Sequence, residues 1–256
     1  MKVFVLTSTG LRHRYLLTRL SEDMNLVGVI QEKKGAYYAR QEENSALVQK
    51  HFETLSFHEK EVFEPLVRDV SKDNIPIRVI ERSKINSDEL IAWAEAQKPD
   101  CIVLFGTGIL NHQWLDRFSG KIINLHLGLS PYYKGSATLF WPFYNNELEC
   151  LGATIHLAAS KVDAGDILAH IKPEIEISDN YYSLNMKIIK KSIDRLPALV
   201  TQYIDGELTP MPQQKIGKVY TKSDFTEDTL YSVIEKYKNG IPENIFKALE
   251  TKSCIC

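Results

Sequence analysis

The chain has few cysteines and no long apolar run. Its 256 residues include four cysteines, too few for a disulfide scaffold, and their positions lack the spacing of a zinc site. We expect Cys254 and Cys256, near the end of the chain, to be reduced. No apolar run approaches the roughly 20 residues that span a bilayer, and the N-terminal stretch becomes polar too early for a signal peptide. These absences predict a soluble, cytoplasmic protein with no bound metal and no membrane segment.

The chain also lacks an excess of charge of either sign. Lysine and arginine number 31 against 33 aspartates and glutamates, for a formal net charge of −2. This balance argues against a broad electrostatic surface for nucleic acid. Hydrophobic residues make up 44% of the sequence, enough for a sizeable core in one large domain or in a domain with a modest appendage.

Short apolar runs rich in β-branched residues recur along the first half of the chain and alternate with segments of helical periodicity. Alternating strands and helices predict an α/β, Rossmann-like fold: a mostly parallel sheet with helices on both faces. The predicted strands are Lys2–Thr7, Asn25–Ile30, Ile77–Ile80, Cys101–Phe105 and Lys121–Leu127.

Helices are expected at Leu11–Leu20, within the segment 36–70, from Ser87 as N-cap to a stop before Pro99, and at Tyr181–Ile204. The runs 153–159 and 167–175 are separated by a polar turn, which predicts an antiparallel hairpin. We therefore divide the chain into a catalytic domain, residues 1–205, and a short C-terminal extension, residues 206–256, with a helix at Glu227–Tyr237. The sequence leaves open whether the apolar residues of this extension pack on their own domain or form a homodimer.

Three polar features follow predicted strands or lie in the hairpin turn. They are the loop Phe105-Gly106-Thr107-Gly108-Ile109-Leu110, the pair Asn124 and His126, and Asp163 in the turn. Ligands of open α/β sheets bind at the carboxyl ends of the strands. Asn124 and His126 are two residues apart in an extended segment, so they share one face. An amide beside an imidazole, with a carboxylate near, is able to stabilise an oxyanion and move a proton.

The order Asn-x-His, a loop with proline and glycine, then Asp-x-Gly resembles the folate-dependent formyltransferases. The stretch Cys101–Asp166 carries most of this resemblance. FGTGIL looks like the folate-site loop of the family, and GLSPYYKG stands where members usually have a serine-leucine-leucine-proline loop followed by glycine. Gly128 departs from the pattern, because many members have serine there.

The resemblance implies that an amine attacks the formyl carbon of 10-formyltetrahydrofolate, forming a tetrahedral intermediate that yields a formamide and tetrahydrofolate. By resemblance, Asn124 binds the developing oxyanion and His126 acts as hydrogen-bond donor and proton shuttle. Asp163 orients or charges the imidazole and helps to remove the amine proton. The loop of residues 105–110 holds the pterin through its backbone.

The resemblance also orders the possible amines. Members that act on initiator transfer RNA add a basic barrel domain, whereas only about 50 residues of balanced charge follow residue 205 here. Members that act on glycinamide ribonucleotide carry a glycine-and-serine phosphate loop after the first strand, which 7–14 does not match, and deformylases usually add an N-terminal domain. The sequence looks most like the sugar N-formyltransferases of surface polysaccharide biosynthesis. We expect a nucleotide-linked amino sugar as substrate, bound by Arg12, Arg14, Tyr132, Tyr133 and Lys134.

Simpler interpretations exist for several of these residues. Arg12 and Arg14 also suit a solvated basic face, and we expect Trp141 and Phe143 to lie in the core. The other histidines have no setting comparable to that of His126, and His156 and His170 are interpreted as structural. Gly106 and Gly108 lack the third glycine of a dinucleotide fingerprint, which disfavours a nicotinamide oxidoreductase. A formyltransferase for another small amine, a 10-formyltetrahydrofolate deformylase and a catalytically silent folate- or nucleotide-binding module remain as alternatives.

Overall fold

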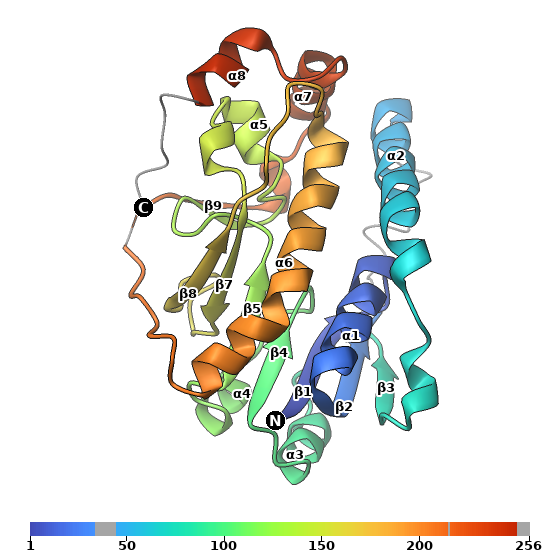
Figure 1. Cartoon of the computed structure of the whole chain (residues 1–256), viewed down its shortest axis with the longest axis vertical. Coiled ribbons are helices and arrows are strands. Elements are labelled where there is room, and N and C mark those ends of the chain that lie inside the picture. Colours follow the sequence, from blue (N-terminus) through green and yellow to red (C-terminus); the bar gives the residue numbers. More distant parts are fainter. Residues whose placement is uncertain (34–44, 215, 250–256) are drawn as a thin grey trace.

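A seven-stranded sheet forms the centre of the protein (Figure 1). The computed structural model describes residues 1–33, 45–214 and 216–249. The strand order is β3-β2-β1-β4-β5-β7-β8; the first five strands in this order are parallel, and β7 and β8 are antiparallel to their neighbours. The predicted, mostly parallel α/β sheet is confirmed. Its strands are β1 (Lys2–Ser8), β2 (Asn25–Glu32), β3 (Ile77–Ile80), β4 (Cys101–Leu104), β5 (Ile122–His126), β7 (Ala153–Leu157) and β8 (Ile167–Ile171).

Alternate side chains of β1 enter two different hydrophobic cores. Val3 and Val5 belong to the larger core, and Phe4 and Leu6 belong to the smaller core on the opposite face. All four side chains are fully buried. A central parallel strand that is covered on both faces requires such a continuous apolar run, which explains why the sequence predicted it well.

Helices cover both faces of the sheet. α1 and α6 lie on the face toward the viewer in Figure 1, and their apolar residues fill the larger core, whereas α3 and α4 contribute to the smaller core. No helix within residues 1–33, 45–214 and 216–249 is long and apolar enough to cross a membrane. The helices are α1 (Leu11–Asp23), α2 (Ala46–Phe63), α3 (Asp88–Ala96), α4 (His112–Arg117), α5 (Trp141–Asn145), α6 (Tyr181–Ile204), α7 (Glu227–Tyr237) and α8 (Glu243–Leu249).

The bounds of α6 and α7 agree with the prediction, and β7 and β8 form the predicted antiparallel hairpin. Ser87 stands at the N-cap position of α3 but makes no capping side-chain hydrogen bond, and the helix ends three residues before Pro99. Part of the predicted helical segment 36–70 forms α2; residues 36–44, like Cys254 and Cys256, lie outside the described residues.

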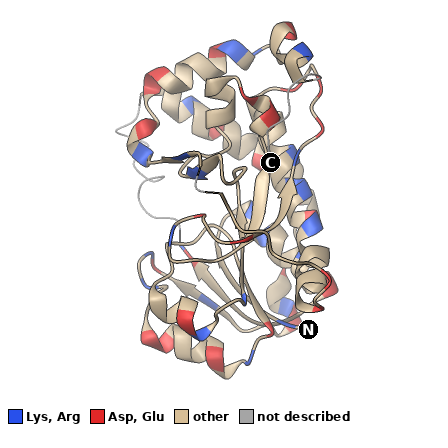
Figure 2. Cartoon of the chain, turned by 90° about the vertical axis from the view of Figure 1, so that its left-hand side faces the viewer, with Lys and Arg blue, Asp and Glu red and all other residues tan. Residues whose placement is uncertain are grey.

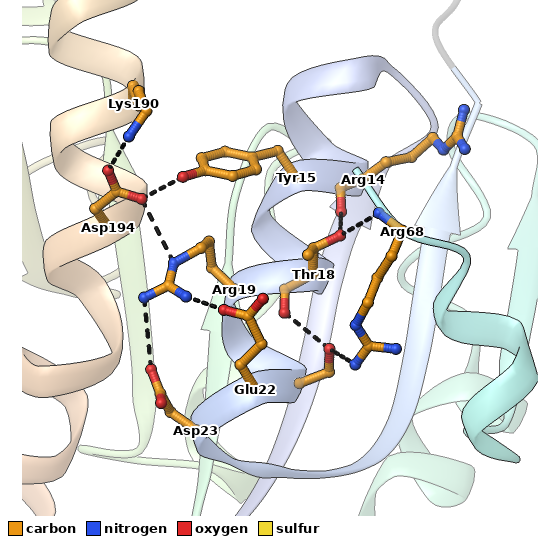
Figure 3. A network of polar contacts seen from close by, with 10 residues as sticks. Arg14, Tyr15, Thr18, Arg19, Glu22, Asp23, Arg68, Lys190 and Asp194 are labelled. Carbon is orange, nitrogen blue, oxygen red and sulfur yellow. Dashed lines mark hydrogen bonds and ion pairs between the residues drawn. The ribbon is translucent and has the colours of Figure 1, made fainter. Parts of the chain in front are cut away.

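A polar network ties α1 to α6 across the larger core (Figure 3). The Asp194 carboxylate of α6 accepts a hydrogen bond from the Tyr15 hydroxyl, and the Lys190 ammonium lies 2.6 Å from it. The Arg19 guanidinium lies 3.5 Å from Asp194 and also pairs with Glu22. Burial, followed by the bond to Asp194, raises the pKa of Tyr15, so this phenol stays protonated and donates at neutral pH. The network therefore fixes α1, whose N-terminus borders the site described below.

The C-terminal extension packs on the rest of the chain. Leu230, Val233 and Tyr237 of α7 are buried, and the Tyr237 ring meets the Phe143 ring edge to face at 5.0 Å. The extension also supplies a strand that the sequence did not predict: β9 (Lys218–Tyr220) pairs in parallel with β6 (Tyr133–Gly135). Phe143 is buried, as predicted, and so is Trp141.

Candidate active site

A cavity of about 860 Å³ opens at the carboxyl ends of β1, β2, β4 and β5, and we call it the strand-end cavity. Its volume falls within the roughly 300–1,000 Å³ of typical ligand pockets. This edge of the sheet includes the switch in strand order between β1 and β4, where α/β proteins usually bind ligands. The cavity is lined by the predicted loop 105–110 and by Asn124, His126 and Asp163, so the structure brings together the predicted loop and triad.

Two buried side chains, those of His13 and Glu32, support the loop 105–110. Gly106 has a φ of +72°, and a Cβ there would lie 2.4 Å from Cε1 of His13. Glu32, at the end of β2, is 4% exposed; its carboxylate accepts hydrogen bonds from the Gly108 N–H at 2.6 Å and the Ser83 N–H at 3.2 Å. Glycine at position 106 is thus required by both the backbone and the close approach of the imidazole.

Asn124 is oriented by a histidine that we predicted to be structural. The pairing of β5 with β7 places His156 directly opposite Asn124. Nδ1 of His156 lies 2.8 Å from the Leu157 carbonyl oxygen, which only accepts, so Nδ1 carries the proton. Nε2 is then free to accept from Nδ2 of Asn124 at 3.0 Å. One N–H of the Asn124 amide is fixed in this way, and its second N–H remains for a ligand.

His126 and Asp163 form an acid–base pair beside the amide. Nε2 of His126 lies 2.9 Å from the Tyr133 carbonyl oxygen, so this nitrogen donates to the backbone. Nδ1 of His126 lies 3.4 Å from Oδ1 of Asp163, while Oδ2 accepts from the Gly135 N–H at 3.0 Å. A neutral His126 has one N–H, and that N–H donates to the Tyr133 carbonyl oxygen. No N–H is then left for the predicted hydrogen bond from His126 to the substrate.

The electrostatic surroundings set the protonation of this pair. Burial lowers the pKa of His126 below its ordinary value, although Asp163 opposes this effect. Burial raises the pKa of Asp163, whereas the Gly135 N–H, which donates to Oδ2, lowers it; a proton on Nε2 of His156 or on His126 lowers it further, and together these effects bring it below its ordinary value. At neutral pH the imidazole is therefore neutral and the carboxylate ionised. Nδ1 and Oδ1 then both present lone pairs, which makes the space between them a place to accept a proton.

The glycine that departs from the family pattern has a physical reason here. A Cβ at Gly128 would lie 2.5 Å from Nε2 of His126 and 2.7 Å from the Tyr133 carbonyl oxygen. Any larger residue would therefore collide with the hydrogen bond that holds His126.

The predicted substrate residues Tyr132, Tyr133 and Lys134 line neither the strand-end cavity nor the cavity that adjoins it. Tyr133 is buried, and its hydroxyl donates to Glu147; the Lys134 ammonium donates to the Ile216 carbonyl oxygen at 3.1 Å. The side chains of Tyr133 and Lys134 are engaged by the protein itself, and all three residues lie outside the lining of the cavities to which we assign the substrates below.

A second cavity of about 820 Å³ adjoins the first, and we call it the helix-side cavity. It is bordered by α1, α2, α6 and the segment that follows β9. Six residues line both cavities: Arg12, Arg82, Leu127, Ser136, Thr138 and Lys222. The helix-side cavity also contains Arg14, which is exposed and whose guanidinium points away from the α1–α6 network in Figure 3.

The helix-side cavity combines positive charge with aromatic walls. Five cationic residues and two carboxylates line it, so its net charge is positive although charges of both signs are interspersed along the chain (Figure 2). The Nε of Arg12 is buried and has no hydrogen-bond partner among the described residues. The cations are Arg12, Arg14, Lys60, Arg82 and Lys222, the carboxylates Glu59 and Glu64, and the aromatic residues His51, Phe52, Phe140, Tyr181 and Phe225.

Sequence reasoning missed Glu32 and His156, and each had a detectable signal. Glu32 is a charged residue two positions after the predicted strand Asn25–Ile30. Thr154 and His156 alternate on one face of 153–159, so antiparallel pairing with β5 would have placed them opposite His126 and Asn124. Within the described part of the chain no group of three or more histidines, cysteines or carboxylates is arranged to hold a metal ion.

Comparison with known proteins supports the resemblance. The model of a family described as formyl transferase matches residues 1–200. A methionyl-tRNA formyltransferase of Bacillus licheniformis is 31% identical over 169 residues, which cover 65% of this chain and 52% of the relative. The chain thus spans about half the length of the curated relatives it matches.

Two solved structures share the fold. A sugar N-formyltransferase from Shewanella sp. superposes with a TM-score of 0.59 at 15% identity, over 88% of this chain and 78% of the other. A formyltransferase from Anoxybacillus kamchatkensis, solved with UDP-4,6-dideoxy-4-formamido-L-AltNAc and tetrahydrofolate, superposes with a TM-score of 0.51 at 17% identity, over 94% and 95% of the two chains. Because the family model covers most of the chain and the fold agrees, this protein belongs to the formyl transferase family.

Proposed function

We propose that the protein is an N-formyltransferase that moves the formyl group of 10-formyltetrahydrofolate to the amine of a nucleotide-linked amino sugar. The observation that carries this proposal is the pair of adjoining cavities. The strand-end cavity contains the amide, imidazole and carboxylate, and the helix-side cavity shares a basic wall with it. Two cavities that meet beside one reactive group suit a transfer between two bound molecules.

In this proposal the strand-end cavity holds the formyl donor. The loop 105–110 lines this cavity, and Glu32 and His13 keep the loop in place. A rigid loop with two glycines lets a flat pterin approach the backbone closely. When bound, the folate supplies the formyl group and the leaving nitrogen.

The side chains of the site are assigned to the steps of transfer. A bond forms between the acceptor amine nitrogen and the formyl carbon, and the second N–H of the Asn124 amide donates to the oxygen that gains negative charge. The amine proton moves into the space between Nδ1 of His126 and Oδ1 of Asp163. The bond from the formyl carbon to the folate nitrogen then breaks, and the same proton passes to that nitrogen. Atoms and charge balance without a further reactant.

The helix-side cavity is assigned to the acceptor. Arg12, Arg82 and Lys222 stand at the shared wall, where guanidinium and ammonium groups favour the phosphates of a nucleotide. The aromatic walls beyond them offer flat surfaces for a base or a sugar. This arrangement supports an anionic acceptor with an aromatic part, as a nucleotide-linked amino sugar is.

A second candidate acceptor is an aminoacylated transfer RNA, because the curated relatives are methionyl-tRNA formyltransferases. The similarity covers only about half the length of these relatives, so it does not show that this chain shares their substrate.

The experiment is a formyl-transfer assay with a panel of acceptors. The protein is given 10-formyltetrahydrofolate with UDP-, dTDP-, GDP- and CMP-linked amino sugars, methionyl-tRNA or glycinamide ribonucleotide. Tetrahydrofolate release is followed by absorbance, and a formyl addition is sought by mass spectrometry. A formylated nucleotide sugar is expected. Formylation of methionyl-tRNA alone would make transfer RNA, and not a nucleotide sugar, the acceptor. Release of tetrahydrofolate without any amine would indicate a deformylase. Folate binding without release of tetrahydrofolate would contradict the proposed chemistry.

A further inference from the structure

The short strand β6 holds both members of the acid–base pair through its backbone. The carbonyl oxygen of Tyr133 accepts from Nε2 of His126 at 2.9 Å. The N–H of Gly135, two residues later, donates to Oδ2 of Asp163 at 3.0 Å. The distance between Nδ1 of His126 and Oδ1 of Asp163 therefore depends on the position of three consecutive residues.

The partner of β6 in the sheet is β9, which belongs to the C-terminal extension. The Lys218 N–H donates to the Tyr132 carbonyl oxygen at 3.2 Å, and the Ser136 N–H donates to the Tyr220 carbonyl oxygen at 2.8 Å. Gly135 has a φ of +92°, and a Cβ there would lie 2.1 Å from the Tyr220 carbonyl oxygen. The two strands are thus in backbone contact on both sides of the residues that hold the pair.

The Tyr220 side chain contacts Tyr133, the first residue of β6, and Trp141, which follows β6 in the chain. Its ring stacks on the Tyr133 ring at 5.8 Å and on the Trp141 ring at 4.4 Å, with interplanar angles of 13° and 11°. The Asn145 amide donates to the hydroxyls of both tyrosines, at 3.0 Å and 3.1 Å. The Trp141 indole N–H donates to the Ser136 carbonyl oxygen at 2.9 Å. Stacked rings of this kind resist rotation of the backbone that carries them.

We propose that β9 is part of the catalytic framework and that Tyr220 is a positioning residue, which sets His126 and Asp163 through the backbone of β6. The inference rests on the proposed formyl transfer for its kinetic readout only. The extension then contributes in two ways: Tyr220 places the proton-accepting pair, and Lys222, two residues later, lines the wall between the cavities. Acceptor binding at Lys222 is in this way linked to the geometry of the pair.

The test compares two tyrosines of the same extension. Tyr220→Leu removes the stack on β6, whereas Tyr237→Leu removes another buried ring of the extension, which contacts Phe143. We expect Tyr220→Leu to lower kcat by roughly ten- to a hundredfold, with KM for the folate changed less than about twofold. Tyr237→Leu should lower the melting temperature while kcat stays within about twofold of wild type. Tyr220→Phe, which keeps the ring, should retain most of kcat.

A second readout does not need activity. The ¹⁵N signals of the His126 ring, assigned by their loss in His126→Gln, should shift in Tyr220→Leu and stay in place in Tyr237→Leu. If wild type transfers no formyl group, the proposed function fails, while these signals still decide the role of Tyr220. Identical His126 signals and equal kcat in the two leucine variants would overturn the inference.

A backbone variant covers the case in which Tyr220→Leu does not fold. Lys218→Pro removes the N–H that donates to Tyr132, and Lys218→Ala keeps it. Lys218 is exposed, so the core is not disturbed. Both variants lose the ammonium, which lies over the Tyr220 ring and pairs with Asp224, so the alanine variant is the reference for the proline variant. We expect the proline variant to shift the His126 signals and lower kcat relative to the alanine variant; equal behaviour of the two would contradict the role of β9.

Discussion

The two cavities differ in the kind of group that shapes them. In the strand-end cavity the reactive side chains are fixed by backbone groups: the Tyr133 carbonyl, the Gly135 N–H and the Leu157 carbonyl each hold one of them, directly or through His156. In the helix-side cavity the walls are long side chains, cationic and aromatic, from three helices and the extension.

In the proposed function, this difference separates the residues that act on the chemical step from the residues that select the acceptor. Backbone groups of a supported strand keep the small distances that proton transfer requires, so only a change in that support, such as the loss of Tyr220 beside β6, should move them. Side chains such as Arg12 and Phe225 change with a single substitution and without altering the sheet. We therefore expect substitutions in the strand-end cavity to act on kcat and those in the helix-side cavity to act on KM for the acceptor.

The largest effect is expected at Asn124. Asn124→Ala removes the donor to the developing oxyanion and should lower kcat by roughly 10²- to 10³-fold, with KM for the folate nearly unchanged. His156→Leu leaves the amide present but without its fixed N–H, and a loss of roughly tenfold is expected. The part of the His156 effect that passes through Asn124 is absent once Asn124 is alanine, so the double variant should be slower than Asn124→Ala only by what His156 contributes at Asp163, whose Oδ1 lies 3.7 Å from Nε2 of His156. Steady-state kinetics of the three variants check this, and additive losses would assign His156 an independent role.

The next effect is expected at Gly128. Gly128→Ala places a methyl group 2.5 Å from Nε2 of His126, so the imidazole or its acceptor must move. We expect a loss in kcat of roughly tenfold or more and a loss of stability of about 1–3 kcal/mol from overpacking. Gly206→Ala is the control for kcat: alanine at the φ of +78° lowers stability through backbone strain, but nothing lies within 4 Å of the added Cβ, so kcat should stay near that of wild type. A Gly128→Ala variant with wild-type kcat would mean that the His126 to Tyr133 bond does not limit the rate.

The comparison also explains what the sequence predicted and what it did not. The strand ends and the loop 105–110 were predictable because buried parallel strands are continuous apolar runs, so the polar residues after them stand out. Asn124, His126 and Asp163 were found from their order along the chain, which resembles a known family.

The residues that position the triad were not predicted, because their roles come from pairing across long sequence distances. β6 and β9 are three residues each, too short for a periodic signal, and they meet only in the folded chain. Tyr133 looked like a ligand because aromatic loops often line sites, yet its ring stacks on Tyr220. His156 looked structural until the register of β5 against β7 placed it beside Asn124.

A smaller effect is expected at the wall between the cavities. Arg12→Ala should raise KM for the nucleotide-linked amino sugar by roughly tenfold, as the loss of one charge-assisted contact predicts. kcat and KM for the folate should change less than about twofold. Arg117→Ala serves as control, because Arg117 pairs with Glu95 on the surface and lines neither cavity. Equal changes in both KM values would place Arg12 outside acceptor selection and weaken the division between the cavities.

The two cavities should also differ in what acid does to them. In the proposed mechanism kcat requires neutral His126 and ionised Asp163 in the strand-end cavity, and the pKa of each is lowered. kcat should therefore fall with decreasing pH only below the ordinary histidine range, near 6.5.

In the helix-side cavity burial lowers the pKa of His51 from 6.5 to about 4, and its Nδ1 lies 3.1 Å from the Tyr182 hydroxyl. The unfolded chain then binds more protons than the folded one between these two values, so stability falls as pH falls through that window.

The change at His51 isolates this last effect, the smallest of the series. His51→Gln removes the titrating group while keeping a side chain able to bond Tyr182, so its stability should fall by about 1 kcal/mol less than that of wild type between pH 7 and about pH 5.5. His126 and His170, whose pKa values are also lowered, continue to contribute in both proteins. Urea unfolding at the two pH values measures the difference, and His112→Gln, at an exposed position, should follow wild type. A His51→Gln variant that loses as much stability as wild type would show that acid acts on the fold through other groups, His126 and His170 among them, and not through His51 in the helix-side cavity.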